Sequence, residues 1–310
     1  MSTLVKPGQR VLVLLPGDKP DSVGDLLARG LGRIDVESVI HGPVRDVSAA
    51  INQIINHGID CLVGIPTQVL ALARSRGNAA IKNGQIKNIL LSTDYVPKAI
   101  HDALAGRWGC GVYHHYGMTE MGLGGGVDCS AFAGYHLREA DLFFEIIDPE
   151  TGRILKDSGI GEVVFTTLTR KGMPLIRYRT GDMARFISDP CPCGSVLRRM
   201  THVGGRWSEI VRLGKNTLSL PEMDEALFSL PWLLDYTATL HPWESENYLE
   251  ITVKGESIPN KFSLEVFDAL TGISSIGKAV NKGNLRLAPV KSAENLRQTT
   301  GVMKRTILFR

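Results

Sequence analysis

The chain has 310 residues, which is more than one average domain and less than three. Its 35 Lys and Arg residues against 32 Asp and Glu residues give a net charge of +3, which excludes a protein that binds polyanions through bulk charge. Only five cysteines occur, so a disulfide scaffold is excluded and a reducing compartment, the cytoplasm, is expected. Without an apolar run of membrane-spanning length or a signal pattern, we expect neither a membrane nor a nucleic-acid partner.

The first part of the chain alternates short apolar strands with helices. Strands are predicted at residues 10–16, 36–40, 61–65, 88–92 and 109–115, and helices at about 22–33, 46–57 and 66–77. This alternation predicts a doubly wound parallel sheet with helices on both faces. Ligands bind such sheets at the carboxyl ends of the strands, which is where Ser92, Thr93, Asp94 and residues 116–120 fall.

The pattern changes near residue 140. An antiparallel, barrel-like region and then a smaller α/β unit are predicted, with strands at 142–148, 161–168, 175–179, 235–241, 247–253 and 284–288, and helices at 221–230 and 263–270. We therefore predict an α/β protein with a truncated large domain over 1–205 and a small, mobile C-terminal domain over 206–310. The large domain divides into a parallel part, 1–139, and a barrel-like part, 140–205.

The segment Tyr116-Gly117-Met118-Thr119-Glu120 carries the most chemical information. An aromatic ring at a strand end can stack on a base, and Gly117 lets the backbone approach a phosphate. Thr119 offers a hydroxyl, and Glu120 is a hard oxygen ligand suited to Mg²⁺. On these five residues alone, a surface turn around a buried tyrosine would be the better explanation. They are followed, however, by Arg177-Tyr178-Arg179-Thr180-Gly181-Asp182 and by Gly205-Arg206.

In this order and at these intervals, YGMTE, RYRTGD and GGR resemble the motifs of the adenylate-forming superfamily of acyl-CoA synthetases, and most closely its phenylacetate-CoA ligase-like branch. The resemblance covers essentially the whole chain. It implies that a carboxylate attacks the α-phosphate of ATP to give an acyl-adenylate and pyrophosphate. The CoA thiol then displaces AMP to give the thioester.

The resemblance also assigns roles to individual residues. It implies that Tyr116 stacks on adenine, that Thr119 touches the α-phosphate and that Glu120 holds Mg²⁺. It further implies that Asp182 binds the ribose hydroxyls with Arg206 nearby. The loop that flanks the nucleotide in relatives is here Ser92, Thr93 and Asp94, in place of the commoner Gly-Ala-Glu. His114 can reach the adenine edge, although a strand-end histidine satisfied by its neighbours is an equally good explanation.

The cysteines form a second group of chemically active residues. Cys191-Pro192-Cys193 presents two thiolates to one point, and with Cys129 and His136 it makes a Cys₃His set that suits a closed tetrahedral zinc site. Three buried thiols and a hydrogen-bonded histidine are the alternative. The phenylacetate-CoA ligase-like branch carries a similar arrangement, which implies a structural Zn²⁺. The remaining cysteines, Cys61 and Cys110, are expected in the core.

Three features depart from the family pattern. The Ser/Thr/Gly-rich phosphate loop of relatives is missing, so we expect a fragment, a split gene product or a late start. Val302 occupies the place of the usual adenylation lysine, and Lys304 is the candidate replacement. Ser208 stands where relatives carry the hinge acid or lysine.

We therefore predict an AMP-forming carboxylate-CoA ligase that uses ATP, Mg²⁺ and CoA. Its substrate is a small carboxylic acid, and the small residues at 122–127 leave room for an aromatic one. A homodimer or a separate N-terminal segment is a possible partner. Two alternatives remain open. One is a catalytically impaired nucleotide- or zinc-binding remnant or subunit, and the other is an adenylating enzyme with an acceptor other than CoA.

Overall fold

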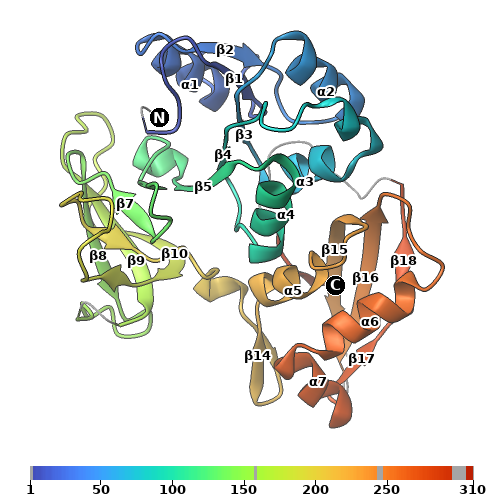
Figure 1. The fold of residues 1–310 in the computed structure, drawn as a ribbon. Coiled ribbons are helices and arrows are strands. Elements are labelled where there is room, and N and C mark those ends of the chain that lie inside the picture. The colour runs from blue at the N-terminus through green and yellow to red at the C-terminus, as the bar shows by residue number, and fades with distance from the viewer. Residues whose placement is uncertain (1–2, 157–158, 243–246, 295–304, 310) are drawn as a thin grey trace.

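The computed structural model describes residues 3–156, 159–242, 247–294 and 305–309 (Figure 1). Its largest element is a nine-stranded sheet with the order β11-β12-β7-β6-β5-β4-β3-β1-β2. Five strands are parallel, as predicted: β1 (Arg10–Val13), β2 (Glu37–Ile40), β3 (Cys61–Gly64), β4 (Asn88–Leu91) and β5 (Gly111–Tyr116). Four short antiparallel strands that the sequence did not predict extend this sheet: β6 (Gly126–Asp128), β7 (Tyr135–Leu137), β11 (Phe186–Ile187) and β12 (Arg199–Met200).

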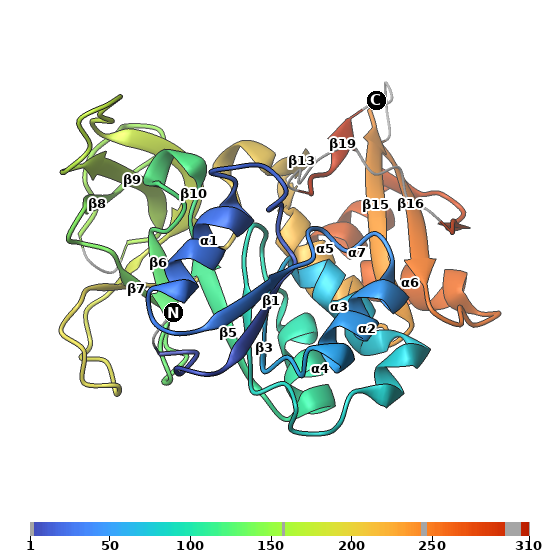
Figure 2. The same cartoon turned by 90° about the horizontal axis from the view of Figure 1, so that it is seen from above.

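Helices cover both faces of the parallel strands, which confirms the doubly wound architecture (Figure 2). Because successive strand residues point to opposite faces, Val11 and Val13 pack with Leu31 of α1 (Val23–Gly32), whereas Leu12 and Leu14 belong to the core on the other face. That second core includes residues of α2 (Val47–Asn56), α3 (Pro66–Arg74) and α4 (Lys98–Trp108). The short 3₁₀ segment η1 (Arg76–Ala80) follows α3.

A second, three-stranded antiparallel sheet lies where the sequence predicts an antiparallel region after residue 140. It has the order β10-β9-β8, with β8 (Leu142–Ile147), β9 (Gly161–Thr167) and β10 (Tyr178–Ala184). The third strand begins at Tyr178, three residues later than expected, and runs through the RYRTGD motif. A separate apolar core that includes Phe144 and Phe165 packs this sheet against Tyr116 and Leu137 of the large one.

The C-terminal unit begins after the 3₁₀ segment η3 (Trp207–Glu209). A hairpin of β13 (Val211–Leu213) and β14 (Asn216–Leu218) leads to α5 (Leu220–Leu227), whose first turn is closed by a capping box between Ser219 and Glu222. The sheet of this unit has the order β17-β16-β15-β19. Its elements are β15 (Leu233–His241), β16 (Asn247–Gly255), α6 (Phe262–Thr271), α7 (Ser274–Asn281), β17 (Leu285–Leu287), β18 (Lys291–Ser292), which pairs with β16, and β19 (Leu308–Phe309).

The C-terminal unit packs closely on the parallel part. Arg74, at the end of α3, donates hydrogen bonds to the carbonyl oxygens of Phe228 (2.8 Å), Leu230 (2.9 Å) and Leu233. From the other side, Glu225 of α5 accepts hydrogen bonds from the Tyr95 hydroxyl at 2.7 Å and the Lys98 backbone N–H at 2.9 Å. Glu225 thus sits at the positive end of α4, where a carboxylate is stabilised.

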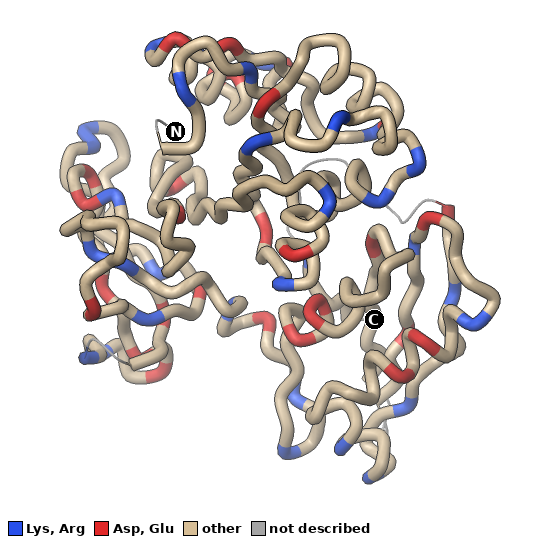
Figure 3. The backbone as a smooth tube through the Cα atoms, in the orientation of Figure 1, with Lys and Arg blue, Asp and Glu red and all other residues tan. Residues whose placement is uncertain are grey.

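Charge and hydropathy add two observations on the described residues. Lys and Arg are interspersed with Asp and Glu over all parts of the fold (Figure 3). Within the described ranges, none of the helices has the length and apolar character needed to cross a membrane.

Candidate nucleotide pocket and metal centre

A pocket lies at the carboxyl ends of β4 and β5, between these strands, β10 and the start of the C-terminal unit. The following residues line it: Thr93, Asp94, Tyr95, Val96, His114, His115, Tyr116, Gly117, Tyr135, Asp182, His202, Val203, Gly205, Arg206, Glu209, Leu220, Pro221 and Arg305. Seven of the eight residues predicted to bind nucleotide are among them, and Ser92 is the exception. The wall therefore joins strand ends that are far apart in the sequence.

Asp182 is the point at which the three motifs meet. Its carboxylate is 2% exposed and accepts hydrogen bonds from the Tyr116 hydroxyl at 3.0 Å and from Nε of Arg206 at 3.0 Å. A backbone bridge also pairs Asp182 with Arg206. Each contact uses one oxygen of the carboxylate, and a carboxylate offers about four lone-pair sites, so both oxygens retain acceptor capacity toward the pocket.

Tyr116 is held rigidly on two sides. Its ring stacks on that of Tyr135, with centroids 5.7 Å apart and planes at 25°. Burial, reinforced by the charge of Asp182, raises the pKa of Tyr116 well above its usual value, so the hydroxyl stays protonated and donates to Asp182. The sequence did not single out Tyr135, since it lies in a three-residue strand without a recognisable motif.

The loop after β4 forms the opposite wall. Thr93 has a φ of 85°, a left-handed conformation that is strained for a β-branched residue and common near functional sites. Ser92 lies behind this wall, where its hydroxyl is 2.9 Å from Nδ1 of His115. Burial lowers the pKa of His115 to about 4, so this imidazole is neutral at pH 7.

Gly117 has a packing role in addition to the predicted one. A Cβ at this position would lie 1.8 Å from the carbonyl oxygen of Leu123, because the chain folds back tightly after the motif. Thr119 and Glu120 follow in the 3₁₀ segment η2 (Thr119–Met121) and are not part of the pocket wall. Burial and the carboxylate of Glu120 raise the pKa of Tyr178. Lys304 lies outside the described residues.

Arg305 is a pocket residue that sequence reasoning missed. Its guanidinium pairs with Asp224 at 2.7 Å and Asp235 at 3.3 Å, and it lies over the rings of Tyr236 at 4.5 Å and Phe228 at 5.0 Å. The pair with Asp224 is deeply buried, since the two side chains are 17% and 1% exposed. No local sequence pattern predicts this cluster, because its members come together only when the C-terminal unit folds.

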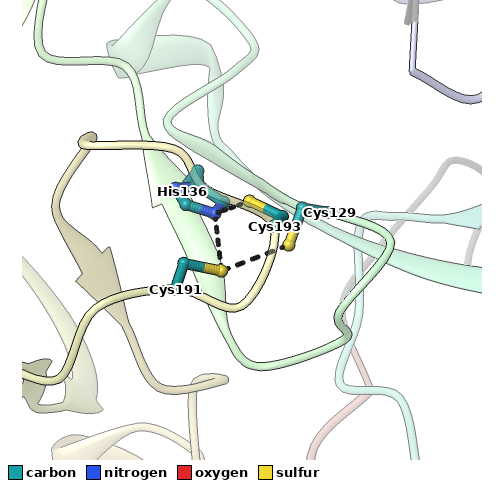
Figure 4. Close-up of side chains that lie close together, drawn as sticks. All are labelled: Cys129, His136, Cys191 and Cys193. Atoms are coloured by element: carbon teal, nitrogen blue, oxygen red, sulfur yellow. Dashed lines mark hydrogen bonds between the residues drawn. The ribbon is translucent and has the colours of Figure 1, made fainter.

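The predicted Cys₃His set forms a compact cluster about the antiparallel end of the large sheet (Figure 4). Cys129 follows β6, His136 lies in β7, and Cys191 and Cys193 lie in the turn between β11 and β12. The Sγ atoms of Cys129 and Cys191 are 3.6 Å apart. Nε2 of His136 lies 3.3 Å from Sγ of Cys191 and 3.4 Å from Sγ of Cys193.

These distances match tetrahedral zinc. Zn–S bonds of about 2.3 Å and Zn–N bonds of about 2.0 Å place two sulfur atoms about 3.8 Å apart and a sulfur and a nitrogen about 3.5 Å apart. All four donor atoms lie within 4.8 Å of one another, and three of the four residues are buried. The donor set, with no position left for a substrate, fits a structural zinc ion.

Comparison with known proteins agrees with the motifs. Residues 36–168 match the family of AMP-binding enzymes. Over 138 residues, 44% of the chain, the sequence is 36% identical to the phenylacetate-coenzyme A ligase of Aromatoleum evansii. Over 116 residues, 37% of the chain, it is 33% identical to that of Escherichia coli K12. The aligned parts cover 31% and 26% of the length of these two ligases.

Solved structures show the same fold at low sequence identity. A 2-hydroxyisobutyryl-CoA ligase in its postadenylation state superposes with a TM-score of 0.79 at 18% identity, over 98% of this chain and 66% of that one. An anthranilate CoA ligase with bound anthranoyl-AMP superposes with a TM-score of 0.70 at 14% identity, over 96% of this chain and 58% of that one. An amide bond synthetase from Marinactinospora thermotolerans superposes with a TM-score of 0.69 at 15% identity, over 98% of this chain and 62% of that one.

The chain shares its fold with these solved structures. Its sequence is similar to AMP-binding enzymes over residues 36–168 and to phenylacetate-coenzyme A ligases over up to 44% of the chain, so the resemblance predicted from YGMTE, RYRTGD and GGR is confirmed. The chain spans only part of the length of these relatives, with 31% of the Aromatoleum evansii ligase and 66% of the 2-hydroxyisobutyryl-CoA ligase covered.

Proposed function

We propose that the chain is the nucleotide-binding part of an AMP-forming carboxylate-CoA ligase. The observation that carries this proposal is the meeting of three motifs at one buried carboxylate, with Tyr116 and Arg206 each 3.0 Å from Asp182 in the pocket wall. In the first step, a carboxylate oxygen of the acid attacks the α-phosphorus of ATP, and the bond to pyrophosphate breaks. In the second step, the CoA sulfur attacks the acyl carbon, AMP leaves, and the thiol proton passes to solvent.

The pocket residues bind and orient the nucleotide in this proposal. The free acceptor sites of Asp182 take the ribose hydroxyls, and the rigid Tyr116 ring forms the wall beside the base. Thr119 contacts the α-phosphate, and Lys304 supplies a cation during adenylation. Glu120 would hold Mg²⁺, which would supply charge neutralisation at the phosphates. Attack at phosphorus needs mainly such positioning and charge neutralisation.

The acid, the acceptor and a further segment that carries the phosphate loop are also part of this proposal. Because residues 122–127 are mostly small, we include aromatic acids in the proposed class of substrate, and CoA is named in the relatives. A segment or subunit outside residues 1–310 supplies the phosphate loop. The Cys₃His cluster holds a structural Zn²⁺ that ties the loop after YGMTE to residues 191–193, in a reducing compartment such as the cytoplasm.

Binding of AMP to the purified chain is the first test. Isothermal titration calorimetry measures the binding of AMP to the wild type, to Asp182→Asn and to the control Asp189→Asn, which changes an exposed carboxylate outside the pocket. Loss of a charge-assisted hydrogen bond of about 1.5–3 kcal/mol predicts about 10- to 100-fold weaker binding for Asp182→Asn only. The absence of AMP binding to the wild type, with native near-ultraviolet circular dichroism, would refute the nucleotide site.

Turnover is tested separately. Pyrophosphate exchange with a panel of aromatic and aliphatic acids, with and without CoA, reports adenylation and thioester formation. Exchange that depends on an acid, followed by CoA-dependent product, supports the ligase. AMP binding without exchange identifies a nucleotide-binding subunit, and exchange without CoA-dependent product identifies another acceptor.

A further inference from the structure

A second cluster of metal-ligating residues lies in the pocket wall, away from the cysteines. It consists of His114 in the second half of β5, Asp128 at the end of β6 and His202 in the segment that leads to Arg206. One ligand atom from each residue lies within 4.8 Å of the other two. From this arrangement we propose that His114, Asp128 and His202 bind a first-row divalent transition metal ion at the edge of the nucleotide pocket.

The carboxylate is already held in place as a ligand would be. Asp128 is 2% exposed, and its Oδ2 accepts a hydrogen bond of 2.9 Å from the backbone N–H of His114. Its Oδ1 lies 2.7 Å from Nε2 of His202. Hydrogen bonds of this kind orient the ligands of metal sites and fix which oxygen faces the ion.

His114 carries a buried polar atom without a hydrogen-bond partner in the described part of the chain. The residue is 8% exposed, and its Nε2 is buried with no hydrogen-bond partner among the described residues. A buried polar atom without a partner costs about 1–3 kcal/mol, and such exceptions call for an explanation such as an ion. The His114 and His202 rings lie 4.4 Å apart between centroids, so both imidazoles border one small volume.

The spacing needs only small adjustments. Metal–ligand bonds of about 2.0–2.2 Å place neighbouring ligand atoms about 3.0 Å apart and opposite ones about 4.2 Å apart. The separation of 2.7 Å between Asp128 and His202 must open slightly, and the proton that the two atoms share is released when the ion binds. Two imidazoles and one carboxylate favour a transition metal ion over Mg²⁺ or Ca²⁺.

Three protein ligands leave coordination positions free, unlike the closed cysteine cluster. Because His114 and His202 both line the pocket, these positions face it and are filled by water in the absence of a nucleotide. The site is distinct from the proposed Mg²⁺ ligand Glu120, which lies in η2 outside the wall. The inference goes beyond the proposed ligase reaction and does not depend on it.

Cobalt titration of the metal-free chain, residues 1–310, tests the inference, because the two sites differ in their spectra. Co²⁺ at the cysteine cluster gives intense thiolate-to-metal charge-transfer absorption, whereas Co²⁺ bound by nitrogen and oxygen gives only weak d–d bands. We expect two equivalents by equilibrium dialysis, of which one carries the charge-transfer band. His202→Gln keeps a donor for Asp128 but removes the imidazole, so it should bind one equivalent fewer with the charge-transfer band unchanged.

The controls make each outcome decisive. His57→Ala removes an exposed histidine and should retain both equivalents. His114→Gln should repeat the loss seen with His202→Gln. A wild type that binds Co²⁺ only with the charge-transfer band, or a His202→Gln variant that keeps every equivalent, would overturn the inference. Loss of the band in Cys191→Ser with retention of the weak bands would support two independent sites.

Discussion

The tightest steric constraint in the pocket predicts the effect of Gly117→Ala. The new Cβ would lie 1.8 Å from the carbonyl oxygen of Leu123, whereas real Cβ contacts below 3.0 Å essentially never occur. Hydrogen bonds from Leu123 N–H to the Met118 carbonyl at 3.0 Å and from Gly125 N–H to the Tyr116 carbonyl at 2.9 Å hold the loop. Relief of the clash requires a backbone shift of about 1 Å that strains both bonds.

The expected loss of stability is the sum of the steric clash and the weakened hydrogen bonding. Overpacking contributes about 1–3 kcal/mol and one lost hydrogen bond about 1 kcal/mol, so Gly117→Ala should lower the free energy of unfolding by about 2–4 kcal/mol. Urea unfolding followed by tryptophan fluorescence measures it, and titration of AMP should show weaker binding because the loop borders the pocket.

Gly106→Ala is the matched control for this variant. Gly106 is exposed in α4, and a Cβ added there would meet nothing within 4 Å, so alanine should raise stability by about 0.5–1 kcal/mol. If Gly117→Ala unfolds at the same urea concentration as the wild type, the described loop geometry is wrong.

Three further predictions concern the packing and the thiols. Arg74→Leu removes three hydrogen bonds to backbone carbonyl oxygens and should lower the free energy of unfolding by about 3 kcal/mol, detected as earlier urea unfolding and faster proteolysis of the C-terminal unit. Asp224→Ala leaves Arg305 without its 2.7 Å partner and should cost about 3–5 kcal/mol, whereas replacing both by apolar residues should recover part of that loss. Burial raises the pKa of Cys61 to about 12 and of Cys110 and Cys129 to about 11, so at pH 8 a disulfide reagent should modify only Cys191 and Cys193, and only after zinc chelation; early labelling of all five would contradict this.

Short apolar runs with clear ends and contiguous motifs were predictable from the sequence. The parallel strands were found because each is a short run stopped by Pro, Gly or polar residues, as in the segment before Pro66. Tyr116 and Asp182 were found because their motifs are contiguous. The roles of these site residues remain predictions, and the division of the chain near residue 205 is likewise a proposal.

The missed strands and the missed helix α4 have different physical causes. The strands β6, β7, β11 and β12 have two or three residues each, too few for an alternating pattern. Helix α4 buries Ile100, Leu104 and Trp108 at a spacing of four, a stripe that was present in the sequence but interrupted by charged neighbours. Apolar residues at i, i+4 and i+8 are the signal that marks this helix.

The pocket and cluster residues outside the motifs were not predicted for another reason. Asp128, His202 and Arg305 acquire their environments only through contacts between distant segments, such as the 2.7 Å pair of Asp128 and His202 across 74 positions. Each is buried or half-buried and charged or ionisable, and each has a partner from another element. Burial of such groups is unfavourable unless a partner compensates, so the fold itself must select these pairs. The pocket is thus built from two kinds of residue: motif residues line it, and pairs between distant segments hold the strand ends together.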